Sequence, residues 1–203
     1  MSQCPNKKPE SSGSNVAAFC LAARVSNRCG AAAECFLTHE EIQKGLAVLD
    51  CGATGSLGGV PALEALTHLR GTPELDFTSQ PSYTFGGCKK MQALCRAKFQ
   101  VQADSKGGAV NIHAMDTKSP ILAGIEALRA AGAIVDFSRD LAVFQKIDPT
   151  KVTKLPRAST GHLLLNLGGD LIGKPEMSTL EFCAILQEQA KGNPESHVAS
   201  KSE

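Results

Sequence analysis

The feature that most constrains the fold of this chain is a short apolar run that ends at a carboxylate inside a glycine-rich turn. The segment Gly45–Gly59 reads GLAVLDCGATGSLGG. Its residues 46–49 suit a buried strand, and the small residues after Asp50 are compatible with a tight turn. Burying a carboxylate costs several kcal/mol, roughly, unless hydrogen bonds or a functional role compensate. Asp50 is therefore expected to face a polar partner or a cleft, the alternative being a strand that exits to solvent.

Charge and composition exclude several functional classes. The 203 residues include 21 Lys and Arg against 20 Asp and Glu, so no net positive field favours nucleic acid or an anionic membrane. One Tyr, eight Phe and no Trp offer little surface for stacking on bases. The apolar run 16–25 is shorter than the roughly 20 residues of a membrane span. With 42% hydrophobic residues, we expect a soluble globular protein that binds neither nucleic acid nor membrane.

The eight cysteines favour a reducing compartment. They lack C-x-x-C spacing, and no convincing signal peptide precedes them, although Lys7, Lys8 and the run 16–25 leave a signal sequence as the alternative. Free thiols in the cytoplasm or nucleus are therefore expected rather than a disulfide framework. The spacing of Cys29, Cys35 and His39 fits no zinc site, so neither a metal nor another cofactor is predicted. The cysteines are Cys4, Cys20, Cys29, Cys35, Cys51, Cys88, Cys95 and Cys183.

Local patterns divide the chain into a tail, a domain and an extension. Residues 1–37 are expected to be mostly disordered, because the first 14 are rich in Ser, Pro, Asn and Lys. Residues 38–147 form the predicted domain. Residues 148–203 form a polar C-terminal extension, with one apolar island at 163–167 and a predicted helix over 178–190.

Within the predicted domain, capping, turn and periodicity signals indicate the elements. A capping box at Thr38–Glu41 opens a helical turn that Gly45 can end. A helix is predicted over 60–69, and 72–81 reads as a loop. Gly86-Gly87 and Gly107-Gly108 are predicted turns. Strands are predicted over 82–85, 97–103, 110–115, 133–137 and 141–144, with the first two forming a hairpin; apolar residues from Ile121 to Leu128 predict a helix that Gly132 caps.

Three stretches follow one another in the chain: AVLDCGATGSLGG, the pair Gly86-Gly87, and PILAGIEAL followed by GAIVDF. Together they resemble one family, the retropepsins, which are the aspartic proteases of retroviruses and LTR retrotransposons. The segment AVLDCGATGSLGG is similar to their active-site loop, in which Asp is followed by Ser or Thr, Gly and Ala. The segment PILAGIEAL, followed by GAIVDF, is similar to their apolar turn, short helix and closing strand, with Gly124 in the turn. Gly86-Gly87 resembles the glycine-rich flap. The residues of these stretches are most similar to those of copia-type polyproteins, and the resemblance covers roughly residues 40 to 147.

The resemblance implies a mainly β protein, a closed barrel of the acid-protease type with one or two short helices. It also implies an endopeptidase in which Asp50 is the catalytic carboxylate. Cys51, Gly52, Ala53 and Thr54 would complete the active-site loop, Gly86 and Gly87 would cover the peptide substrate, and Gly124 would support the loop from beneath.

The chain contains only one loop of this kind, so the loop can supply only one catalytic carboxylate per chain. The chemistry needs two carboxylates that face one water, one ionised and one protonated. With one Asp50 per chain, the site requires a homodimer that places both copies on its two-fold axis.

Cys51 departs from the family pattern. The usual hydroxyl at this position holds the two loops of the dimer together, whereas a thiol is a weak donor with a larger atom. Cys51 is interpreted as a tolerated variant, a sign of decay in a retroelement copy, or a redox-sensitive position. The alternatives to an active protease are an inactive retropepsin-like module that binds peptide or dimerises, and an unrelated small β domain. A thiol nucleophile with His39, His68 or His113 as its base has no supporting spacing.

Overall fold

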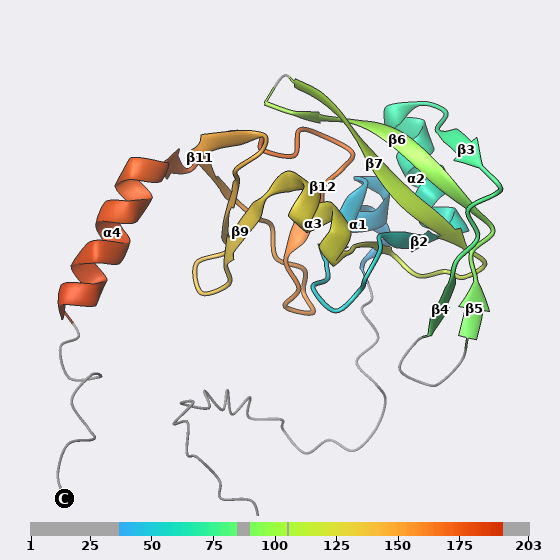
Figure 1. The fold of residues 1–203 in the computed structure, drawn as a ribbon, viewed down its shortest axis with the longest axis horizontal. Helices are drawn as coiled ribbons and strands as arrows, with labels where there is room; N and C mark the ends of the chain where they lie inside the picture. The colour runs from blue at the N-terminus through green and yellow to red at the C-terminus, as the bar shows by residue number, and fades with distance from the viewer. Residues whose placement is uncertain (1–36, 85–89, 105, 193–203) are drawn as a thin grey trace, which may run out of the picture. The chain divides into compact units, whose positions relative to one another are not determined.

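The structure is a computed structural model that describes residues 37–84, 90–104 and 106–192 (Figure 1). The predicted tail therefore lies outside the described residues except for Leu37, which is buried against Val48 and Leu164. Gly86 and Gly87 also lie outside them. The helices are α1 (His39–Gln43), α2 (Val60–Arg70), α3 (Ile125–Ala131) and α4 (Thr179–Gly192). The strands are β1 (Leu46–Leu49), β2 (Leu57–Gly59), β3 (Glu74–Asp76), β4 (Ser82–Thr84), β5 (Lys90–Gln92), β6 (Cys95–Ala103), β7 (Lys106–Met115), β8 (Ile121–Ala123), β9 (Ala133–Asp136), β10 (Leu141–Phe144), β11 (Asp148–Lys154), β12 (Leu164–Asn166) and β13 (Met177–Ser178).

The described chain is mainly β with few helices, as predicted, but its main sheet does not close into the predicted barrel. Seven strands follow one another in the order β12-β1-β8-β2-β7-β6-β3. β12 and β3 are the two edges of this sheet and do not pair with each other. The long hairpin of β6 and β7 contributes nine residue pairs from Cys95↔Ala114 to Ala103↔Lys106 and dominates one half of the sheet (Figure 1). The closed barrel is therefore corrected to an open mixed sheet.

Strand β1, which leads to Asp50, lies inside the main sheet. β8 pairs with it in parallel, with Ala47 opposite Ile121, and β12 pairs with it antiparallel, with Ala47 opposite Leu165. Ala47 and Leu49 enter the main hydrophobic core, while Val48 faces a second cluster. Both faces of β1 are thus covered by apolar side chains, which explains why its sequence is a continuous apolar run.

Helices α1 and α2 follow their predicted signals closely. Thr38 and Glu41 form the predicted capping box of α1, and Gly45 follows the helix with a left-handed φ of 67°. α2 begins at Val60 with Pro61 in its first turn and packs on β2, β6 and β7. Its buried residues are Ala62, Leu63, Ala65 and Leu66. Capping and periodicity were sufficient here because both act within one helix.

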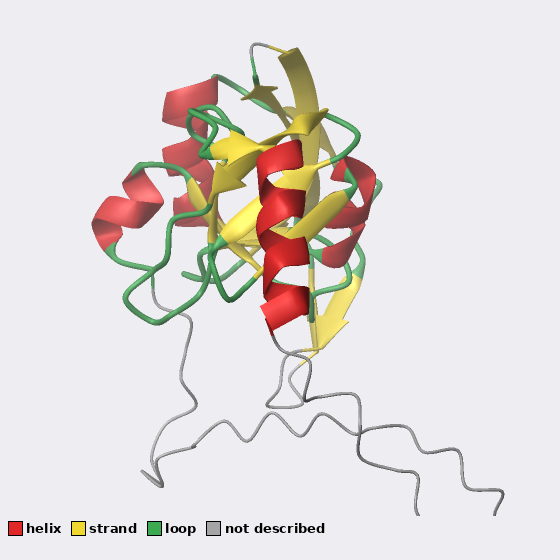
Figure 2. Ribbon diagram, turned by 90° about the vertical axis from the view of Figure 1, so that its left-hand side faces the viewer, coloured by secondary structure: helices red, strands yellow, loops and turns green. Residues whose placement is uncertain are grey.

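The predicted C-terminal extension contributes strands to both larger sheets. β11 pairs with β10 in a four-stranded sheet of order β13-β11-β10-β9, and β12 borders β1 in the main sheet. α4, the helix nearest the viewer in Figure 2, contacts β11 and β13, and its Phe182 is buried against Leu141, Val143 and Val152. The described fold therefore shows no break at residue 147, where the sequence placed a boundary. The pairing of β10 with β11 and of β1 with β12 joins the two predicted segments.

The predicted hairpins are partly corrected. β4 pairs with β5, not with the strand over 97–103, which instead pairs with β7. Gly107 and Gly108 lie within β7, opposite Gln102 and Val101, so they are not a turn. β3 lies in the predicted loop 72–81, and β8 replaces the first part of the helix predicted from Ile121. Within the described ranges, no helix is both long enough and apolar enough to span a membrane.

Candidate active site

Asp50 stands directly after buried strand β1, and the loop that follows it fixes its carboxylate. Its backbone N–H donates to the Ala123 carbonyl at 3.1 Å, continuing the pairing of β1 with β8. Its Oδ1 accepts hydrogen bonds from the backbone N–H groups of Gly52 at 2.8 Å and Ala53 at 3.2 Å. The residue is half-buried. The polar partner expected for this carboxylate is thus its own loop, which orients the side chain while leaving it accessible.

The turn between β8 and α3 supports this loop from behind. The N–H groups of Ile125 and Glu126 donate to the carbonyls of Ala53 at 2.8 Å and Thr54 at 3.3 Å. The Gly124 N–H donates to the hydroxyl of buried Ser56 at 3.1 Å. The two segments are far apart in sequence, and these three bonds join the loop of residues 50–56, called the Asp50 loop below, to the start of α3.

Gly124 is required at this contact because the two backbones touch. A β-carbon at position 124 would lie 2.5 Å from the carbonyl carbon and oxygen of Gly55 and 2.9 Å from the Ser56 nitrogen. The backbone of Gly124 itself is extended, with φ of −75°, so its conformation does not demand glycine. The close approach alone therefore accounts for a glycine here, and the structure places Gly124 against Gly55 and Ser56 of the loop.

The other residues of the predicted loop differ in exposure. Cys51, Gly52 and Thr54 are exposed, and Ala53 is half-buried. Cys51 is a free thiol. The loop therefore presents Asp50 and Cys51 together at the surface, on a backbone that is anchored by buried residues on both sides.

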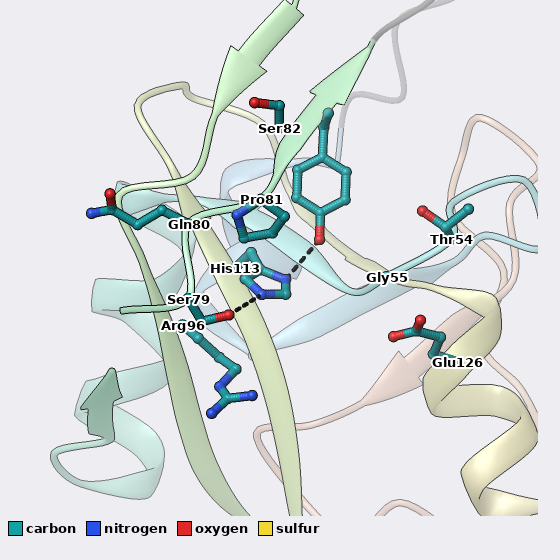
Figure 3. A pocket seen from close by; sticks show the side chains of 10 residues that line it. Thr54, Gly55, Ser79, Gln80, Pro81, Ser82, Arg96, His113 and Glu126 are labelled. Atoms are coloured by element: carbon teal, nitrogen blue, oxygen red, sulfur yellow. Dashed lines mark hydrogen bonds between the residues drawn. The ribbon is translucent and has the colours of Figure 1, made fainter. Parts of the chain in front are cut away.

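The hairpin of β4 and β5 approaches this region through Tyr83. The Tyr83 ring packs with Met91 against a cluster of Leu57, Ala93 and Met115. Its hydroxyl lies 2.7 Å from His113 Nδ1, and Ser79 Oγ lies 3.4 Å from Nε2 of the same ring (Figure 3). The base of the hairpin is thus fixed to β7 through one histidine.

His113 also connects to the Asp50 loop, because its backbone N–H donates to the Ser56 carbonyl at 2.9 Å. Burial, reinforced by nearby Arg96, lowers the pKa of His113 from its ordinary value, although Ser56 and Glu126 oppose this shift. Burial, with a smaller contribution from Glu126, raises the pKa of Tyr83. The neutral forms of both side chains are therefore favoured at neutral pH.

A cavity of about 470 Å³ opens between the Asp50 loop and the base of the hairpin. Thr54 and Gly55 form one side of it, and Glu126 faces it from α3 (Figure 3). Asp50, Cys51, Gly52 and Ala53 do not line it. The remaining lining residues are Ser79, Gln80, Pro81, Ser82, Tyr83, Arg96 and His113.

The sequence did not assign Tyr83, His113 or Glu126 to a site. His113 lies in the predicted strand 110–115, and its ring is hydrogen-bonded. Its neighbours Ser79 and Tyr83 are remote in sequence, so no local spacing joins them. The one available signal was that Tyr83 is the chain's single tyrosine and lies in a predicted strand beside the glycine turn.

The described residues contain no cluster of three or more His, Cys, Asp or Glu side chains that could hold a metal ion. Cys51, Cys95 and Cys183 are the cysteines within those ranges, and all three are free. A comparison with protein-family models and with curated proteins gives no match to this chain.

Proposed function

We propose that this protein is an aspartic endopeptidase of the retropepsin type, in which Asp50 from each chain of a homodimer activates the attacking water. The observation that carries the proposal is the orientation of the Asp50 carboxylate by Gly52 and Ala53 at the exposed end of a buried strand. A carboxylate held by backbone donors keeps its geometry without a cation, and its second oxygen stays available to a water or a partner carboxylate.

The order of the supporting elements agrees with the resemblance. The Asp50 loop comes first, the β4–β5 hairpin second, and the β8–Gly124–α3 unit third, and the last of these is hydrogen-bonded to the first. The open sheet differs from the closed barrel of the expectation, so the proposal depends on this local arrangement and not on the overall architecture.

A homodimer follows from the number of carboxylates. One proton shared by two close carboxylates leaves one as the base and the other as the acid. Since the chain contains one loop of this pattern, the second carboxylate is proposed to come from a second copy. The substrate is a peptide or polyprotein, and no cofactor takes part. We also propose a reducing compartment, the cytoplasm or nucleus, in which the exposed Cys51 thiol stays reduced.

The second candidate function is an inactive retropepsin-like module that binds peptide or dimerises. The exposed Cys51 favours it, because a thiol is a poor substitute for the hydroxyl that links the two loops in the family. Catalysis, as distinct from peptide binding, separates the two candidates.

The test is cleavage of a diverse peptide library by the full chain between about pH 4 and pH 7, where a carboxylate pair is half-protonated. We expect a bell-shaped pH profile, activity per chain that falls on dilution, and complete loss of cleavage in Asp50→Asn with an unchanged fold and dimer. Absence of cleavage by a folded dimer would remove the enzyme. Peptide binding that survives in Asp50→Asn would then establish the inactive module.

A further inference from the structure

We propose that the cavity between the Asp50 loop and the hairpin base is a pocket for a basic side chain of a bound peptide, and that Glu126 sets this preference. This inference rests on the proposed function only for the nature of its ligand. It names a specificity-determining residue and a substrate class that the resemblance does not supply.

The geometry of the pocket floor brings two polar groups to one point. A β-carbon on buried Gly55 would lie 2.9 Å from the Tyr83 hydroxyl and 3.8 Å from Glu126 Oε2. The hydroxyl from β4 and the carboxylate from α3 therefore face the same space above Gly55, which stays open because residue 55 has no side chain. Figure 3 shows Glu126 and Thr54 on the side of the cavity opposite His113.

Of the two charged residues in the lining, Arg96 is paired within the described residues and Glu126 is not. Arg96 is the one cation in the lining, and its Nη2 lies 2.7 Å from Asp76 Oδ2 in an ion pair. The neutral form of His113 is favoured. Glu126 forms no ion pair or side-chain hydrogen bond with any residue in the described ranges, and it is exposed. An incoming cation would thus meet one carboxylate that has no competing partner.

The hydrogen-bonding capacity of the pocket also suits a cation. With the His113 proton on Nε2, Nδ1 accepts the Tyr83 hydroxyl proton, which leaves the Tyr83 oxygen free to accept. Carboxylate, phenol and the Thr54 hydroxyl can then accept from an ammonium or guanidinium group, which carries donors only. A neutral apolar side chain would make no hydrogen bond to these acceptors, so we expect it to bind more weakly.

The position of the pocket predicts where the basic residue lies in the peptide. Thr54 and Gly55 belong to the same loop as Asp50, but Asp50 does not line the cavity. The proposed homodimer carries two copies of this pocket, related by its two-fold axis. The basic residue is therefore expected at a fixed distance from the scissile bond, on either side of it, and not at the bond itself.

The first experiment uses a probe that requires no catalysis. n-Butylammonium, which imitates a lysine side chain, is titrated into the ¹⁵N-labelled full chain, with 1-pentanol as the uncharged probe. We expect saturable shifts of the Gly55 and Glu126 amides with the ammonium and none with the alcohol. Glu126→Gln should weaken ammonium binding about fivefold, the upper range for an exposed ion pair. The matched control Glu64→Gln, an exposed glutamate on α2, should leave it unchanged. Equal affinity of Glu126→Gln and wild type, or no shift at Gly55, would overturn the proposal.

The second experiment reads the specificity of cleavage and separates the two proposals. Products of a proteome-derived peptide library should carry Lys or Arg at one fixed distance from the cleaved bond, on either side of it, and Glu126→Gln should abolish this enrichment. Cleavage without the enrichment would remove the basic pocket and leave the endopeptidase intact. Ammonium binding without any cleavage would retain the pocket and remove the endopeptidase in favour of the inactive module.

Discussion

Gly124→Ala tests whether the contact between the α3 turn and the Asp50 loop is as close as the structure has it. The new methyl group would lie 2.5 Å from the Gly55 carbonyl, and both groups belong to backbones that cannot rotate away. An ordinary carbon–oxygen contact would require the two segments to separate by roughly 1 Å. Such a separation would also stretch the bond from the Gly124 N–H to the Ser56 hydroxyl.

The expected cost follows from these contacts. Overpacking a tight contact costs about 2–3 kcal/mol of unfolding free energy, and the smaller entropy of an unfolded chain with alanine returns about 0.4–1 kcal/mol. The net loss of about 2 kcal/mol would lower the urea midpoint by about 1 M for an m-value near 2 kcal/mol per M. If the protein is an endopeptidase, a displacement of the loop by about 1 Å should also lower cleavage about a hundredfold.

Gly107→Ala is the matched control for this experiment. A β-carbon at position 107, within β7, would have no heavy atom within 4 Å, and its φ is not left-handed. Its stability should stay within about 0.5 kcal/mol of wild type. Urea denaturation followed by circular dichroism gives both values. Equal midpoints for Gly124→Ala and Gly107→Ala would refute the close contact on which the support of the loop depends.

Three further predictions concern the loop, the hairpin and the smaller sheet. Cys51→Ser should raise activity or tighten the dimer by about 1 kcal/mol, since a hydroxyl is the better donor; cleavage rates and sedimentation that do not change would show that the thiol is no defect. Tyr83→Phe should cost about 1 kcal/mol and speed hydrogen exchange in β4 and β5, because His113 loses its partner at Nδ1; unchanged exchange would disprove this attachment. Hydrogen bonds from Ser138, assisted by Arg139, lower the pKa of Asp136 to about 2. Asp136→Asn should therefore cost up to about 1 kcal/mol above pH 4, and this difference should vanish as the pH falls through about 2; a difference independent of pH would contradict the ionic origin.

The sequence predicted those elements whose signals are local. The capping box at Thr38, the Pro61 start of α2 and the left-handed cap at Gly132 each act within a few residues, and each is confirmed. The strands predicted over 133–137 and 141–144 correspond to β9 and β10, and the turn between them is also set locally, because the Asp136 carboxylate accepts hydrogen bonds from Ser138 and Arg139, only two and three positions away.

The errors occur where distant residues decide the outcome. The turn expected at Gly107 forms earlier, where Asp104 takes a left-handed φ of 53° while its N–H donates to Asp170 and its carboxylate pairs with Lys151. β2 has too few residues to show the two-residue period of a strand. It is a strand because it pairs with β7 and β8. The open sheet could not be predicted for a related reason, because no local pattern specifies whether two edge strands meet.

The candidate site divides along the same line. The carboxylate, its glycine turn and Gly124 could be found in the sequence, because the first two are contiguous and the third lies in a segment that resembles a known signature. The pocket could not be found, since Thr54, Tyr83 and Glu126 come from three segments that only the folded chain brings together.

The place of β12 beside β1 sets the moment at which this site can exist during synthesis. The ribosome releases Ala47 early, yet its two neighbours in the sheet, Ile121 and Leu165, are made much later. At about 5–20 residues per second, roughly 10 s separate the emergence of β1 from that of β12. A nascent chain therefore carries an unpaired apolar strand and no assembled carboxylate loop until nearly all of its described residues have been translated. If the protein is the proposed endopeptidase, it therefore could not cleave its own chain before the synthesis of that chain is nearly finished.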